Sequence, residues 1–138
     1  MTLLGIDFGR KKIGLAYSDE TELVAAPLET LRVNNLDEAV AKIKEVKAKL
    51  QAGKIILGFP TSVIGVESPE MRLIKKFAVA LEQALKLEVK LWDETYSSKR
   101  AEFGARGRKR ANSDSEAARI ILQEYLDDQN ERRKHEQA

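Results

Sequence analysis

The side chains that could do chemistry in this 138-residue chain are oxygen donors and cations. The sequence has no cysteine, which excludes a disulfide, a thiol nucleophile, a zinc–thiolate site and an iron–sulfur cluster. Its single histidine, His135, lies in a polar segment, a poor position for acid–base catalysis or metal binding. An enzyme of this composition must therefore work with carboxylates, hydroxyls, Lys and Arg, and with metal ions that oxygen atoms hold.

Most of the 22 acidic residues occupy positions that face solvent, but three do not fit that pattern. Asp7 ends the first apolar run, where an unpaired charge is costly. Glu94 follows the last predicted strand, and Asp114 shares one face of the last predicted helix with Ala117 and Ala118. Each acid also has a structural explanation, as a turn former, a loop acid or a partner of the helix dipole. If the three converge, they form an oxygen cluster suited to Mg²⁺ or Mn²⁺, and hence to metal-dependent chemistry on a phosphodiester.

Basic residues are concentrated in one segment. Residues 1–98 carry 14 basic and 14 acidic residues, whereas residues 99–112 carry six basic residues and one acidic residue, a net charge of +5. Such a segment is typical of a partner that carries phosphates, although a solvated charged loop has the same composition. The residues that we expect to contact phosphates are Lys12, Arg106, Arg108, Lys109 and Arg110. Gly104, Gly107 and the lack of apolar residues predict a mobile loop over 104–112.

The hydrophobic pattern predicts five strands and three main helices. We expect strands over 2–8, 13–17, 23–33, 54–58 and 87–91, and helices over 36–50, 69–85 and 113–128, with one or two helical turns over 97–103. Asn35 and Ser68 are predicted caps, and Gly53 is predicted to end the first helix. Pro27 predicts an edge position for the third strand. A strand meander followed by alternating helices and strands indicates a three-layer α/β fold, with ligands outside the carboxyl ends of the parallel strands.

The length fits one domain. We expect a domain over residues 1–128 and a polar, frayed C-terminal tail over 129–138, with no internal repeat or linker. No apolar stretch approaches the roughly 18 residues that a spanning helix needs. The first apolar run precedes the basic residues, the wrong order for a signal peptide, so we expect a cytoplasmic protein without a membrane.

The start of the chain has a second interpretation. Asp7-Phe8-Gly9 after a strand is also how ATP-binding folds of the actin and hexokinase type open their phosphate loop. That fold needs a second phosphate loop and a second domain, which 138 residues cannot supply. The motif is short, and we therefore favour the metal site over an ATP site.

Four motifs resemble the YqgF/RuvX family. They are residues 5–19 (GIDFGRKKIGLAYSD), 57–60 (LGFP), 91–94 (LWDE) and 114–126 (DSEAARIILQEYL), and in this order they span about residues 3–128. The members are ribonuclease H-like proteins described as pre-16S rRNA nucleases or Holliday junction resolvases. The resemblance implies a three-layer ribonuclease H-like fold, in which helices flank a central mixed five-stranded sheet.

The same resemblance implies that Asp7, Glu94 and Asp114 are the catalytic and metal-binding residues. They would hold two Mg²⁺ or Mn²⁺ ions in a nuclease that acts on structured nucleic acid, most directly the 5′ side of precursor 16S rRNA in the small-subunit precursor. Two departures leave the substrate preference open. Residues 61–65 read TSVIG where the family usually has LNMDG, and Thr95 stands where Arg is common.

Two other functions stay open at this point. The first is a resolvase of four-way DNA junctions, which needs two active sites and therefore favours a homodimer over a monomer. The second is a nucleic-acid-binding module without catalysis, against which the intact set of three acids argues. The sequence does not distinguish RNA from a DNA junction, Mg²⁺ from Mn²⁺, or one oligomeric state from another.

Overall fold

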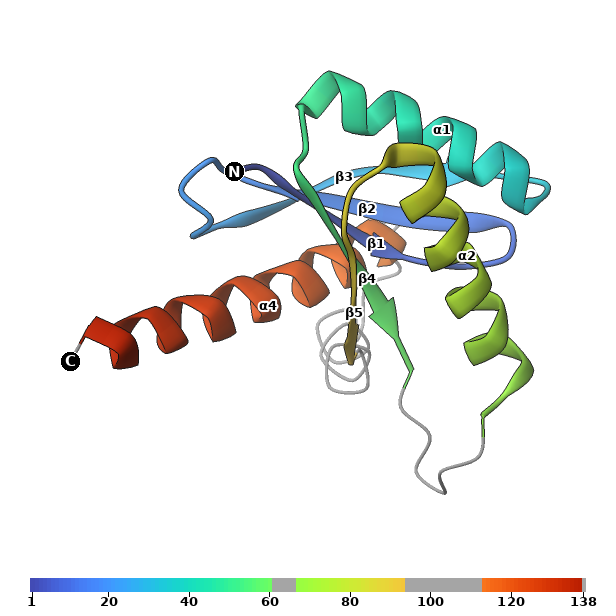
Figure 1. Ribbon diagram of the computed structural model, residues 1–138. Coiled ribbons are helices and arrows are strands. Elements are labelled where there is room, and N and C mark those ends of the chain that lie inside the picture. The colour runs from blue at the N-terminus through green and yellow to red at the C-terminus, as the bar shows by residue number, and fades with distance from the viewer. Residues whose placement is uncertain (61–66, 94–112, 138) are drawn as a thin grey trace.

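A computed structural model describes residues 1–60, 67–93 and 113–137, which form one sheet with helices on both faces (Figure 1). The strands are β1 (Leu3–Asp7), β2 (Lys12–Ser18), β3 (Ala25–Arg32), β4 (Lys54–Phe59) and β5 (Val89–Asp93). The helices are α1 (Leu36–Leu50), α2 (Pro69–Leu85) and α4 (Ser113–Gln137). The predicted mixed five-stranded sheet between helices is confirmed.

The strand order is β3-β2-β1-β4-β5. β1, β2 and β3 form an antiparallel meander, whereas β4 and β5 run parallel to β1. The predicted strand meander is confirmed, and β3, which holds Pro27, is an edge strand as expected. Because β1, β4 and β5 are parallel, their carboxyl ends meet at one edge of the sheet. Asp7 stands at that edge.

Two hydrophobic cores fix which residues face which helix. α1 and α2 cover one face of the sheet and α4 covers the other (Figure 1). Along β1, Leu4 and Ile6 pack in the core under α1 and α2, whereas Leu3 belongs to the core under α4. Side chains alternate between the two faces of a strand. Asp7 therefore lies on the face that α4 covers.

The helix ends follow the predicted caps except at one position. The Asn35 side chain accepts a hydrogen bond from the Glu38 N–H at 2.8 Å, and Ser68 caps α2 with Pro69 in its first turn, both as predicted. α1 ends at Leu50 and is capped by Gln51, which has a left-handed backbone with a φ of 54°, so the prediction that Gly53 ends the helix is wrong. The Gln51 N–H donates to the Ala48 carbonyl, so the terminating turn closes two residues before the glycine.

α4 is longer than its apolar pattern predicts. The helix continues to Gln137, so the expectation that it stops near residue 128 and that 129–138 is a frayed tail is wrong. Polar contacts extend it: Arg132 pairs with Asp128 at 3.0 Å, and Arg133 pairs with Glu22 of the β2–β3 turn at 3.1 Å. The Asn130 amide also donates to the Glu22 carbonyl at 3.0 Å. Residues 131–136 remain exposed on this extension.

Some predictions fall on residues outside the described part. These are the helical turns over 97–103, the loop over 104–112 and the departure from the family pattern at 61–65. None of the helices in the described part is long and apolar enough to cross a membrane.

Candidate active site

Asp7 lies between two glycines on the face that α4 covers. Its partner on β2 is Gly14. On the other side, the pairing of Ile6 with Leu57 sets Gly58 of β4 level with Asp7. Neither neighbour has a side chain, so no side chain of an adjacent strand lies directly beside the half-buried Asp7 on this face. The arrangement suits a carboxylate that must reach a ligand.

Gly14 is also where α4 begins its contact with the sheet. A Cβ atom at Gly14 would lie 2.0 Å from the Asp114 carbonyl oxygen and 2.8 Å from the Ser115 nitrogen, so only glycine lets the helix approach this closely. The Ser115 hydroxyl is fully buried and lies 2.9 Å from the Thr30 hydroxyl of β3, which holds the same turn. The first turn of α4 therefore rests on the strand partner of Asp7, and the backbone of Asp114 lies against Gly14.

Glu94, the third predicted acid, lies outside the described residues. The described chain stops at Asp93, which ends β5 beside Phe59. Trp92 faces α4, where its ring meets the Tyr125 ring edge-on at a centroid distance of 5.3 Å. β5 thus ends at the same edge of the sheet as Asp7. Within the described residues, no three His, Asp or Glu side chains form a group that could hold a metal ion, and these residues contain two of the three predicted acids.

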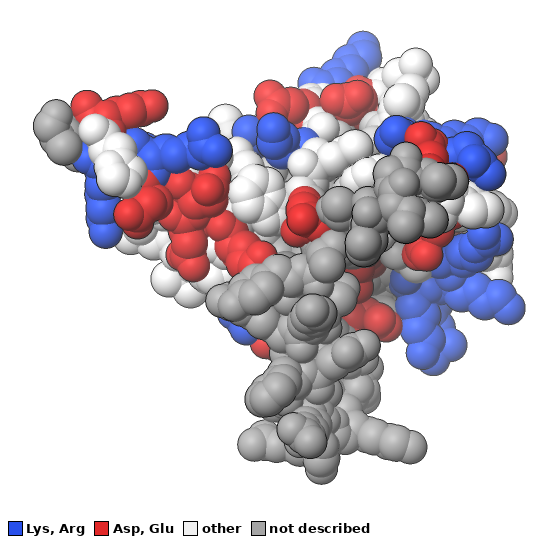
Figure 2. Space-filling view, turned by 90° about the horizontal axis from the view of Figure 1, so that it is seen from below, with Lys and Arg blue, Asp and Glu red and all other residues white. Residues whose placement is uncertain are grey.

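The predicted phosphate-binding residues are described only in part. Lys12 is the exposed first residue of β2, two residues before Gly14 and therefore on the same face. Arg106, Arg108, Lys109 and Arg110 lie outside the described residues. In Figure 2, Lys and Arg side chains gather on the right, the side on which Figure 1 places the β1–β2 turn. This turn brings Arg10 and Lys11, both exposed, to the edge of the sheet where β1 ends.

Sequence reasoning missed two residues near Asp7 and Asp114. Arg32, at the end of β3, is the strand partner of Lys12, and Ser115 fixes the first turn of α4 through Thr30. The register of β2 and β3 determines the pairing of Arg32 with Lys12, and the docking of α4 determines the contact of Ser115 with Thr30. Neither leaves a local signal in the sequence, although Gly14 before a short apolar run was a visible hint of close backbone approach.

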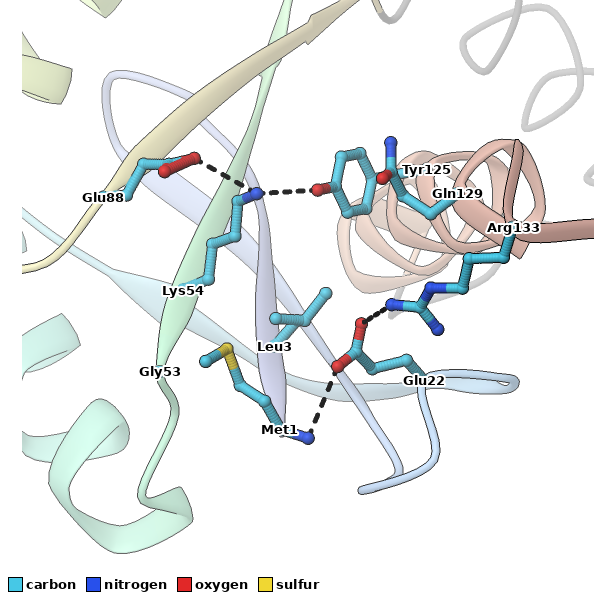
Figure 3. Close-up of a pocket in the computed structure, with 9 residues that line it drawn as sticks. All are labelled: Met1, Leu3, Glu22, Gly53, Lys54, Glu88, Tyr125, Gln129 and Arg133. Atoms are coloured by element: carbon cyan, nitrogen blue, oxygen red, sulfur yellow. Dashed lines mark hydrogen bonds and ion pairs between the residues drawn. The ribbon is translucent and has the colours of Figure 1, made fainter. Parts of the chain in front are cut away.

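A polar pocket of about 340 Å³ lies at the opposite end of the sheet, where β1 and β4 begin (Figure 3). Lys54 Nζ lies 2.7 Å from the Tyr125 hydroxyl and 3.1 Å from the Glu88 carboxylate. Burial works to lower the pKa of Lys54, but these hydrogen bonds outweigh it and raise the pKa above its ordinary value. Across the pocket, Arg133 of α4 pairs with Glu22 (Figure 3). These contacts tie the outer half of α4 to the sheet.

Comparison with known proteins gives the family. Residues 1–128 match the family model described as RuvX, Holliday junction resolvase. A relative from Anaeromyxobacter dehalogenans (strain 2CP-1), named "Putative pre-16S rRNA nuclease", is 39% identical over 133 residues, which cover 92% of this chain and 97% of the relative. A relative of the same name from Caldanaerobacter subterraneus is 35% identical over 136 residues, which cover 94% and 98%.

Solved structures give the fold. RuvC of Thermus thermophilus superimposes with a TM-score of 0.63 at 14% identity over 94% of this chain and 96% of RuvC. The Fowlpox virus resolvase in complex with Holliday junction DNA superimposes with a TM-score of 0.56 at 14% identity over 94% of this chain and 99% of the resolvase. These likenesses confirm the predicted ribonuclease H-like fold. With the family match over residues 1–128, they support one conclusion: the chain belongs to the RuvX family of nucleases.

Proposed function

We propose that this protein is a metal-dependent nuclease that hydrolyses phosphodiester bonds in structured nucleic acid, with the 5′ region of precursor 16S rRNA as its substrate. The observation that carries the proposal is the contact of the Asp114 backbone with Gly14, which is the strand partner of Asp7. Membership of the RuvX family supports nuclease activity. The names of the curated relatives support an rRNA precursor as the substrate.

Asp7, Glu94 and Asp114 would hold Mg²⁺ or Mn²⁺. Two observations support the fit: the donors in the described part are carboxylate oxygens, and glycines flank Asp7 on both sides. When bound, such ions lower the pKa of a water molecule and stabilise charge on the leaving oxygen. Asp7 is fixed by β1, and Asp114 is fixed by a turn whose neighbouring hydroxyl is buried. The backbone of each of these two acids thus belongs to a regular element, β1 or α4.

Lys12, Arg106, Arg108, Lys109 and Arg110 would contact phosphates of the substrate. Phosphate contacts position a nucleic acid and do not read its sequence. We expect that changing the four residues of the 106–110 cluster to Ala weakens the binding of every nucleic acid and flattens the salt dependence of the affinity, because fewer counterions are released. Metal binding at the acids should remain. If the quadruple variant binds and cleaves like the wild type, the cluster is only a solvated segment.

A side-by-side cleavage assay tests the proposal. The wild type, Asp7→Asn and Asp127→Asn are incubated with precursor 16S RNA and with a synthetic four-way DNA junction in Mg²⁺ or Mn²⁺. Asp127 is the matched control, because it is exposed and stands 13 residues along α4 from Asp114, roughly 20 Å at 1.5 Å per residue. We expect the wild type and Asp127→Asn to cut the RNA at the same rate and Asp7→Asn to be inactive.

Other outcomes select the rival functions. Cleavage of the junction alone, by a homodimer in sedimentation, would identify a resolvase, which the description of the family and the likeness to resolvases favour as the second candidate. Binding of nucleic acid without cleavage in either metal would identify a binding module. Cleavage by Asp7→Asn at the rate of the wild type would refute the proposed site.

A further inference from the structure

Two cations face each other where β2 pairs with the end of β3. Lys12, the first residue of β2, is the direct partner of Arg32, the last residue of β3. Both side chains are exposed, and neither has an ion pair with any residue in the described part. Lys42, whose ammonium pairs with Glu38 at 3.1 Å, donates to the Arg32 backbone carbonyl at 2.6 Å and does not neutralise the pair. Like charges directly opposite each other destabilise a sheet, so the stability of the fold does not explain this pair.

The pair lies on the same face of the sheet as the acids. Gly14 and Thr30 are partners two residues further into β2 and β3, and Thr30 contacts α4. Because side chains alternate along a strand, Lys12 and Arg32 share the face of Gly14 and Thr30. The residues between, Ile13 and Leu31, belong to the core on the opposite face.

The strand fixes how far Lys12 lies from Gly14, the partner of Asp7. Gly14 is the partner of Asp7, and Lys12 lies two residues from Gly14 along β2. Two strand residues span roughly 7 Å. This step is similar to the separation of successive phosphates along one nucleic-acid strand. α4 contacts the sheet at Gly14 through its first turn, and Lys12 and Arg32 are exposed one step beyond it.

We propose that Lys12 and Arg32 together hold one backbone phosphate of the substrate, the phosphate next to the one that the acids act on. This inference rests on the proposed function and names a further binding position for it. The guanidinium of Arg32 can donate two parallel hydrogen bonds to a phosphate, and the ammonium of Lys12 supplies a compact charge from the opposite side. A phosphate between them replaces their mutual repulsion with two attractions.

The test measures binding in the Asp7→Asn background, so that no RNA is cut. The probe is precursor 16S RNA, titrated at several salt concentrations with Arg32→Ala, Arg32→Lys and the control Lys44→Ala, an exposed lysine of α1. We expect Arg32→Ala to weaken binding about tenfold and to reduce the slope of log K against log salt by about 0.7 to 0.9, the value for one phosphate. Arg32→Lys should keep that slope, and Lys44→Ala should match the parent.

Two readouts separate a binding role from a structural one. The unfolding midpoint of Arg32→Ala should equal or exceed that of the parent, because the repulsion with Lys12 is relieved. In addition, an oligonucleotide whose single neutral methylphosphonate replaces the phosphate next to the cleavage site should bind the parent more weakly than the unmodified oligonucleotide. The Lys12→Ala/Arg32→Ala variant should bind the modified oligonucleotide with the same affinity as the unmodified one.

The outcomes distinguish this inference from the proposed function. If the wild type cuts RNA while Arg32→Ala binds with the parent's affinity and salt slope, the phosphate site is wrong and the nuclease stands. If the methylphosphonate weakens the parent and the double variant equally, the phosphate is held elsewhere and the inference is also wrong. If the wild type neither binds nor cuts RNA or a DNA junction, both proposals fall.

Discussion

Gly14→Ala should damage the site through the backbone, without removing a catalytic group. The new methyl carbon would lie 2.0 Å from the Asp114 carbonyl oxygen, whereas ordinary contacts begin at 3.4 Å, so α4 must move by about 1.4 Å. Rotation of a side chain cannot relieve a clash with backbone. Overpacking of this kind costs about 1–3 kcal/mol, and replacing glycine in a strand returns about 0.5–1 kcal/mol. The net loss of unfolding free energy is about 0–2.5 kcal/mol.

The effect on cleavage should be larger than the effect on stability. A misplacement of about 1 Å in a catalytic geometry can reduce a rate by about 100-fold. Urea unfolding and cleavage of precursor RNA per folded molecule measure the two effects. Gly53→Ala is the control, because the three atoms nearest to its Cβ atom all belong to the flexible Met1 side chain, the first at 2.9 Å. If Gly14→Ala cuts RNA at the rate of Gly53→Ala, the helix does not depend on this glycine, and our account of how Asp114 is placed is refuted.

Three further predictions concern acid, alkali and metal. The hydroxyl of Thr21 and backbone N–H groups lower the pKa of Asp19 to about 2, so its contribution to stability, present above about pH 4, is lost as the pH falls toward 2. Acid unfolding of Asp19→Asn should lack this loss. The pKa of Lys54 is raised, so the contribution of Lys54 to stability is present below the ordinary pKa of 10.5 and is lost at higher pH. Lys54→Met should be less stable than the wild type at pH 7, and its melting temperature should lack the alkaline decline that Lys54 causes. Mg²⁺ at about 100 times its Kd should stabilise the wild type by about 2.7 kcal/mol, and an equal shift of the melting curve in Asp114→Asn would contradict the metal site.

The sequence was sufficient for the elements because their signals are local. Strands such as β4 are short apolar runs, and the caps at Asn35 and Ser68 act within one helical turn. The outer half of α4 was missed because it has no apolar stripe. Its support comes from ion pairs such as Arg132 with Asp128 and from Glu22, which lies 111 residues away from Arg133. A composition of charged residues does not show which of them will find partners.

The candidate site residues stand out in the sequence by their type, whereas their strand partners do not. Asp7 and Asp114 stand out because a charge at the end of an apolar run or on an apolar helix face is costly unless it is paired or binds a metal ion. The pairing of Lys12 with Arg32 depends on the register of β2 and β3, which shifts between Gly14 and Ala16. A shift of one residue would have turned one of the two cations to the other face. Register is a property of the assembled sheet.

The docking of α4 on Gly14 also bears on the order in which the protein becomes active during its synthesis. Asp7 belongs to the first strand to be made, and Asp114 belongs to the last helix, so the acids are separated by more than a hundred residues of chain. The sheet of β1 to β5 is complete in sequence before any residue of α4 exists. Closing so long a loop is slow compared with forming a hairpin or a helix turn. While the strands are being made Asp114 does not yet exist, so it can come near Asp7 only after α4 has been made and has docked on Gly14.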